Sequence, residues 1–141
     1  MLDTTVLLYA AGRPHEIAQP CRALLSAVSR GRVRASTTVE VIQEFVHVRA
    51  RRRDREDATR LGNAYARSLA PLLAVDEVDL RDGLQLFQRV DRLGAFDSVL
   101  AAAAVNRNAE ALISADAGFA VVPGLDHVDP RSAGMERFLS E

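Results

Sequence analysis

Four carboxylates stand inside apolar segments of the sequence, where an ordinary surface acid is not expected. They are Asp3, Glu44, Asp97 and Asp116. Taken singly, each has a structural explanation, since an Asp can cap a helix and a Glu can face water. Taken together they predict a metal site, because crowded carboxylates repel one another and raise one another's pKa values unless a divalent cation neutralises them. A donor set of oxygens alone favours Mg²⁺ or Mn²⁺ over zinc.

The segments around these acids alternate between short apolar runs and longer amphipathic stretches. The apolar runs at 6–9, 33–35, 72–75 and 111–113 predict short, buried parallel strands or the tails of such units. Apolar residues at helical spacing predict helices over 16–29, 38–50, 55–69, 79–90 and 96–107. Gly31 is a stop signal after the first helix, and Ser36, Thr37 and Thr38 are candidate N-caps of the second. The alternation predicts an α/β sandwich with a parallel sheet, in which ligands gather at the carboxyl ends of the strands.

Length and composition predict one compact domain over residues 1–141. The chain has 48% hydrophobic residues, enough for a core without disulfides. Cys21 is the single cysteine, so an intramolecular disulfide and a four-thiolate zinc site are excluded. The apolar opening stretch, Met1–Ala11, is much shorter than the roughly 20 residues of a membrane helix and follows no basic segment. We therefore expect a cytoplasmic protein without a targeting segment.

Charge is distributed unevenly along the chain, although the net charge is only −1. Residues 13–67 carry 12 Arg and 6 acids, whereas residues 68–141 carry 6 Arg and 12 acids. A basic half can bind a polyanion, while near neutrality argues against a protein that coats DNA. Five arginines directly follow the Glu44 segment, and they either track a nucleic-acid backbone or form a solvated helix end. They are Arg49, Arg51, Arg52, Arg53 and Arg55.

Four segments of the chain, in this order, resemble those of the PIN-domain nucleases, and specifically the VapC-like toxins. The segment 2–9 (LDTTVLLY) is similar to the opening Asp-Thr/Ser segment of that family, and 41–48 (VIQEFVHV) to its apolar helix with one Glu. The segment 96–104 (FDSVLAAAA) is similar to the Asp that starts an Ala-rich helix, and 112–119 (LISADAGF) to the Thr/Ser-x-Asp-x-x-Phe segment. The resemblance spans nearly the whole chain and implies a PIN-like three-layer sandwich, with a central parallel sheet flanked by helices.

The resemblance also implies a metal-dependent endoribonuclease. Its catalytic, metal-binding acids would be Asp3, Glu44, Asp97 and Asp116. Thr4 and Ser114 would be supporting hydroxyls, and Glu40, one helical turn before Glu44, is a further candidate. As a hypothesis, Asp3 and Asp97 bind one Mg²⁺ or Mn²⁺ ion directly, while Glu44 and Asp116 act through water, complete a second site or orient the attacking water. The family implies single-stranded or loop RNA as substrate and products with a 5′-phosphate and a 3′-hydroxyl.

The partners that the resemblance implies are a cognate VapB-like antitoxin, whose tail would lie across the active site, and a second copy of the chain in a homodimer. The apolar faces of 16–29 and 55–69 are candidates for either contact, although core packing is the more ordinary use of such residues. The resemblance implies no contact with a membrane.

Other readings of the acids fit the sequence less well. A haloacid-dehalogenase-like phosphatase needs a second Asp two residues after the first, where this chain has Thr5. A receiver domain needs a Lys, and the chain contains none. His15, His47 and His127 receive no catalytic role. A PIN-like module that binds RNA or protein without cutting remains open as the alternative to an enzyme.

Overall fold

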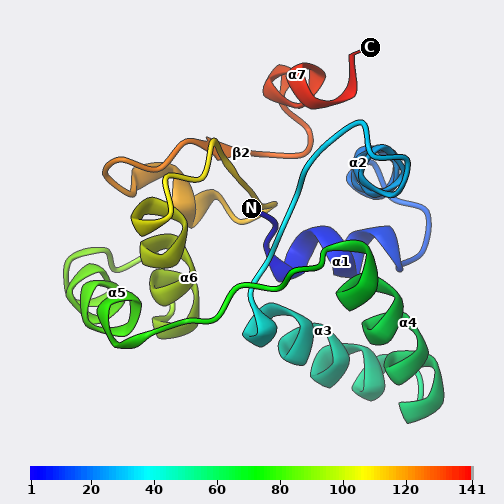
Figure 1. The fold of residues 1–141 in the computed structure, drawn as a ribbon, viewed down its shortest axis with the longest axis horizontal. Coiled ribbons are helices and arrows are strands. Elements are labelled where there is room, and N and C mark those ends of the chain that lie inside the picture. Colours follow the sequence, from blue (N-terminus) through cyan, green and yellow to red (C-terminus); the bar gives the residue numbers. More distant parts are fainter. Residues whose placement is uncertain (141) are drawn as a thin grey trace.

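The computed structural model describes residues 1–140 and consists mainly of helices around a short parallel sheet (Figure 1). The helices are α1 (Thr4–Ala10), α2 (Ala18–Ser29), α3 (Val39–Arg52), α4 (Arg55–Ser68), α5 (Glu77–Arg89), α6 (Ala95–Asn106) and α7 (Glu136–Leu139). The strands are β1 (Leu112–Ile113) and β2 (His127–Val128), and two 3₁₀ turns, η1 (Ala117–Val121) and η2 (Ala133–Met135), follow them.

The five helices predicted from apolar spacing are confirmed as α2 to α6. Their ends follow local chemistry. Thr38 caps α3, because its hydroxyl accepts a hydrogen bond from the backbone N–H of Val41 at 3.3 Å. Gly31 ends the α2 region with a φ of +71°, in the left-handed range that glycine adopts without strain. Helices α3 and α4 pack against each other, as do α5 and α6 (Figure 1).

The sheet is built from very short extended segments. Strands β1 and β2 pair in parallel, with Leu112 opposite His127. Single parallel bridges join Leu2 to Ile113 and Thr38 to Leu73. The backbone N–H of Leu2 also donates to the carbonyl of Ser36 at 3.0 Å, which connects the two bridges. Extended segments therefore lie side by side in the order 73, 36–38, 2, 112–113 and 127–128.

The predicted strand at 6–9 is wrong, because these residues lie within helix α1. Asp3 caps that helix, and Val6 and Leu7 are buried on it. A run of four apolar residues is compatible with both a strand and a buried helix. Here Asp3 caps the N-terminus of a helix, and the run becomes part of that helix. The predicted run 33–35 is also not a strand, and in 72–75 only Leu73 makes a bridge. The run 111–113 is confirmed by β1.

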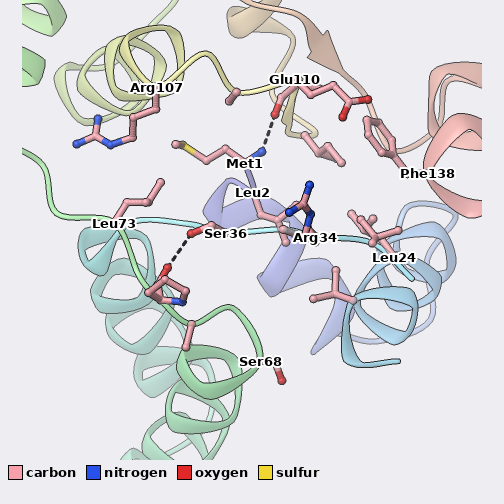
Figure 2. A pocket seen from close by; sticks show the side chains of 18 of the residues that line it. Met1, Leu2, Leu24, Arg34, Ser36, Ser68, Leu73, Arg107, Glu110 and Phe138 are labelled. Atoms are coloured by element: carbon pink, nitrogen blue, oxygen red, sulfur yellow. Dashed lines mark hydrogen bonds between the residues drawn. The ribbon is translucent and has the colours of Figure 1, made fainter. Parts of the chain in front are cut away.

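The α/β class with parallel pairing is thus confirmed, while the three-layer arrangement stays a prediction. The parallel order places Asp3 and Ser114 at one edge of the sheet, just beyond Leu2 and Ile113. At the opposite edge lies a hollow of about 840 Å³, lined by Met1, Leu73, Phe138 and others, and seen from close by in Figure 2. None of the four predicted acids lines this hollow. Over residues 1–140, no helix has the length and apolarity that crossing a bilayer requires.

Candidate active site

Asp3 is held rigidly at the junction of the sheet and helix α1. Asp3 is only 2% exposed, and its backbone N–H donates to the carbonyl of Ile113 at 3.0 Å. One carboxylate oxygen, Oδ2, accepts from the hydroxyl of Thr5 at 2.6 Å and from that of Ser114 at 2.7 Å. The backbone N–H of Thr5 donates to the same oxygen at 3.3 Å, which caps the helix. All three donors bind the same carboxylate oxygen, and together they fix the orientation of the carboxylate.

Two hydroxyls connect Asp3 to the end of β1. Ser114, predicted as a supporting hydroxyl, accepts at Oγ from the N–H of Asp116 at 3.0 Å while it donates to Asp3. Thr5 accepts in the same way from the N–H of Ala115 at 3.0 Å. Sequence reasoning missed Thr5. The available signal was its position two residues after Asp3, the spacing at which a Thr or Ser commonly bonds an Asp side chain at a helix start.

Glu44 reaches the same region from helix α3. The hydroxyl of Thr4, the other predicted supporting residue, donates to Oε2 of Glu44 at 2.5 Å. Glu44 is partly buried, so it does not simply face water. Glu40, one turn earlier, is also partly buried, and its Oε2 is shielded from solvent without a hydrogen-bond partner among residues 1–140.

Asp97 and Asp116 complete the set from the second half of the chain. Asp97 lies in the first turn of α6, but Gly94 is the N-cap, so the explanation of Asp97 as a capping residue is wrong. Asp116 does cap a turn, since its Oδ1 accepts from the N–H of Gly118 at 2.7 Å. Its side chain lies at the exposed rim of the site.

The charges of three of the predicted acids reach the fourth, Asp97. Burial, followed by the charges of Asp3, Glu44 and Asp116, raises the pKa of Asp97 to about 7. Within residues 1–140, however, no three Asp, Glu, His or Cys side chains are close enough to form a ready-made metal-binding group. Hydroxyl donors hold two of the four acids, Asp3 and Glu44. A divalent cation fits this set, since it would replace repulsion by attraction and all the donors are oxygens.

The predicted arginine cluster divides into two kinds of residue. Arg49 is only 13% exposed in its side chain, and its Nε donates to Asp57 at 2.5 Å. Its Nη1 also donates to the carbonyl of Ala11 at 2.9 Å, so Arg49 connects α3 to α4 and to the end of α1. The other four arginines of the cluster are exposed: Arg51, Arg52, Arg53 and Arg55.

A short parallel sheet, with Asp3 just beyond the bridged residue Leu2 and three further acids whose charges reach one another at Asp97, defines a class of protein, and comparison with known sequences agrees. The profile of the PIN domain matches residues 1–125. The chain therefore belongs to the PIN-domain family, as its four segments predicted.

Individual relatives are VapC proteins. Ribonuclease VapC7 of Mycobacterium tuberculosis is 48% identical over 145 residues, covering all of this chain and 98% of the relative. Ribonuclease VapC13 of the same organism and VapC ribonuclease Mb1869c of Mycobacterium bovis are each 25% identical over 125 residues, covering 89% of this chain and 95% of those proteins.

Proposed function

We propose that this protein is a metal-dependent endoribonuclease that acts as the toxin of a VapBC-type toxin–antitoxin pair. The observation that carries the proposal is that the charges of Asp3, Glu44 and Asp116 all raise the pKa of Asp97, which supports a common site for the four acids. The names of the related proteins, among them Ribonuclease VapC7, support RNA as the substrate. We place its action in the cytoplasm, where RNA and an antitoxin are both available.

Four carboxylates would hold the metal, Mg²⁺ or Mn²⁺. When bound, such an ion generates a nucleophile from water and stabilises charge on the phosphate in the transition state. Asp3 contributes a carboxylate whose direction is set by Thr5 and Ser114 before any ligand arrives. Asp97 supplies a group that gives up its proton readily near neutral pH, because its pKa is about 7.

Glu44 and Asp116 differ in how firmly the structure holds their side chains. Glu44 is held at one oxygen by Thr4, which positions it from helix α3. Asp116 is exposed at the rim, where it can orient water or a substrate phosphate through the metal. Glu40 is kept as a supporting acid, because its shielded Oε2 has no partner in the described part of the chain.

The proposed partners are a VapB-like antitoxin and a second copy of this chain. Helix α5 offers a surface for the second copy, because Val78, Leu80, Leu84 and Phe87 are 46–49% exposed. The faces of α2 and α4, suggested by the sequence, bury residues such as Cys21, Leu24 and Ala58 in the core instead. Self-association is therefore proposed through α5.

Cleavage of a defined RNA by purified protein, with and without Mn²⁺, tests the function. We expect metal-dependent cutting by the wild type and none by Asp97→Asn, which keeps the size of the side chain and removes its charge. If the wild type binds RNA but never cuts it, the alternative of a non-catalytic PIN-like module is correct. If Asp97→Asn cuts as well as the wild type, the assignment of the site is wrong.

A further inference from the structure

A pocket of about 380 Å³ opens beside the acids, between helix α1, the loop after it and the end of helix α3. Thr5, whose hydroxyl donates to Asp3, forms part of its wall. We propose that this pocket binds one nucleotide of a single-stranded RNA, next to the bond that is cut. The inference rests on the proposed function and adds a binding site that the acids do not provide. Its volume lies in the range of about 300–1,000 Å³ typical of small-ligand sites.

Two free cations line the pocket. Arg13 lies in the loop after α1 and Arg52 at the end of α3, and both are exposed. Neither side chain has a hydrogen-bond or ion-pair partner within residues 1–140. An arginine without a protein partner can bind a phosphate by two parallel hydrogen bonds. Cations from two separate elements suit two phosphates of one strand better than a single ion.

The pocket also carries an aromatic wall. The rings of Tyr9 and His15 have centroids 5.3 Å apart and planes inclined by 31°. Nδ1 of His15 accepts from the backbone N–H of Ile17 at 3.2 Å, which leaves Nε2 to carry the proton and to donate to a ligand. Any of the nucleic-acid bases can stack on such rings, because every base has a flat π-face. With few aromatic residues elsewhere, this chain offers a platform for one base and not for a long strand.

The loop that carries Arg13 is held in place before a ligand arrives. Arg22 donates to the carbonyls of Ala10 at 2.9 Å and Gly12 at 2.7 Å. Arg49 donates to the carbonyl of Ala11 between them. These two bonded arginines therefore hold the loop in place, while Arg13 and Arg52, which line the pocket, remain available. A preorganised site loses less entropy on binding.

RNA fits this pocket better than an acidic peptide does. An acidic peptide would use the two arginines and leave the aromatic wall without a partner. A nucleotide uses both, because its phosphates meet the cations and its base meets the rings. The continuity of the wall with Thr5 places that nucleotide against the carboxylates.

The inference is tested by binding of a fluorescein-labelled single-stranded RNA of twelve nucleotides to the Asp97→Asn protein, which is expected to leave the RNA uncut. Fluorescence anisotropy is the readout. We expect Arg13→Ala and Arg52→Ala each to weaken binding about three- to tenfold and to make its salt dependence less steep. Tyr9→Leu, which keeps an apolar side chain, should weaken binding about fivefold or more without changing the salt dependence. In the catalytic protein the same changes should lower kcat/KM and leave the Mn²⁺ dependence unchanged.

Arg30→Ala is the matched control, because Arg30 is exposed and does not line the pocket. Binding by Arg13→Ala and Arg52→Ala that equals the control overturns the inference, even if both variants lose affinity for an antitoxin peptide. Equal losses in all three would show only a general charge effect and would also overturn it. A wild type that neither binds nor cuts RNA overturns the proposed function, and this inference with it.

Discussion

At the scale of single residues, the site consists of side chains whose neighbours were far away in the sequence. Asp3 meets Ser114, and Thr4 meets Glu44. Residue type and apolar context were sufficient to predict the four acids as candidates, and the resemblance to PIN-domain nucleases added the two hydroxyls. Thr5 could not be ranked above Thr4 from sequence, because only the fold shows that Thr5 bonds Asp3 whereas Thr4 bonds Glu44.

Asp97→Asn should make the metal-free protein more stable at high pH. The pKa of Asp97 is raised to about 7 in the folded state, first by burial and then by the other acids. A raised carboxyl pKa favours folding below the unfolded value near 4, and this contribution is lost as the pH rises through 7. In EDTA at pH 8, the variant should gain on the order of 1–3 kcal/mol in the free energy of unfolding. Urea denaturation at pH 8 and pH 5 measures it, and the gain should shrink at pH 5.

Asp91→Asn is a suitable control, because Asp91 is exposed and lies apart from the acid set. If Asp97→Asn and Asp91→Asn respond alike at pH 8, the acids do not repel one another at Asp97.

Thr5→Val should weaken metal binding although Thr5 need not touch the metal. The substitution keeps the branched shape and removes the donor to Asp3 and the acceptor for Ala115. Loss of such a supporting hydrogen bond typically weakens metal affinity about 10- to 100-fold. Calorimetric titration with Mn²⁺ measures the change, and Thr5→Ser, which retains the hydroxyl, should restore most of the affinity. Unchanged Mn²⁺ binding by Thr5→Val would show that Asp3 does not depend on this bond.

At the scale of elements, the five long helices α2 to α6 were predictable, whereas only one of the predicted strands, β1, is confirmed. Helices of twelve or more residues repeat their apolar face several times, and caps such as Thr38 mark their starts. The strands have only two residues each, too few for any periodicity. The wrong strand at 6–9 shows the same limit, because its apolar run is shorter than two helical turns.

One buried carboxylate fixes the pair of helices that carries Asp97. Asp79 of α5 is 1% exposed and accepts from Asn106 at 3.0 Å and from the N–H of Asp76 at 3.1 Å. Nη1 of Arg107 lies 2.7 Å from it. Burial alone would raise the pKa of Asp79, but these three partners lower it. The buried carboxylate of Asp79 therefore holds helix α6, and with it Asp97, against α5, and its charge is stabilised only by these three partners together.

Asp79→Asn should cost about 2–4 kcal/mol of folding free energy at pH 7, because it removes the buried member of the ion pair and leaves the partly buried Arg107 without its counter-charge. A lowered carboxyl pKa stabilises the folded state above the unfolded value near 4, and the benefit disappears as the pH falls through the folded value. The difference between variant and wild type should therefore be large in urea at pH 7 and small at pH 3. Asp82→Asn, on the same helix but more exposed, should cost much less at pH 7. Equal losses for the two variants would contradict this role of Asp79.

At the scale of the whole molecule, helix α5 exposes apolar residues that we expect another molecule to cover. Four of the six large apolar residues that the described part leaves about half exposed lie on helix α5: Val78, Leu80, Leu84 and Phe87. The opposite side of α5 is buried against α6, where a Cβ on Gly83 would lie 2.5 Å from Cα of Val99. The repeat of Leu80, Leu84 and Phe87 is visible in the sequence, but only the packing of α6 shows that these residues point outward.

We propose a second copy of the chain as the occupant of this surface. Helix α5 starts with Glu77 and ends with Arg89. Two copies of α5 packed antiparallel about Leu84 would place each Glu77 near the partner's Arg89 and would bury both apolar rows. We therefore expect the wild type to sediment as a dimer at micromolar concentration and Leu84→Asp as a monomer. Val121→Asp removes an equally exposed apolar residue away from α5 and should leave the dimer intact. Because Leu84 lies outside the acid set, the monomeric variant should still bind Mn²⁺ with the affinity of the wild type, which separates loss of assembly from loss of the site. A wild type that is monomeric, or a Leu84→Asp variant that stays dimeric, would show that another partner covers α5 or that the dimer uses a different face.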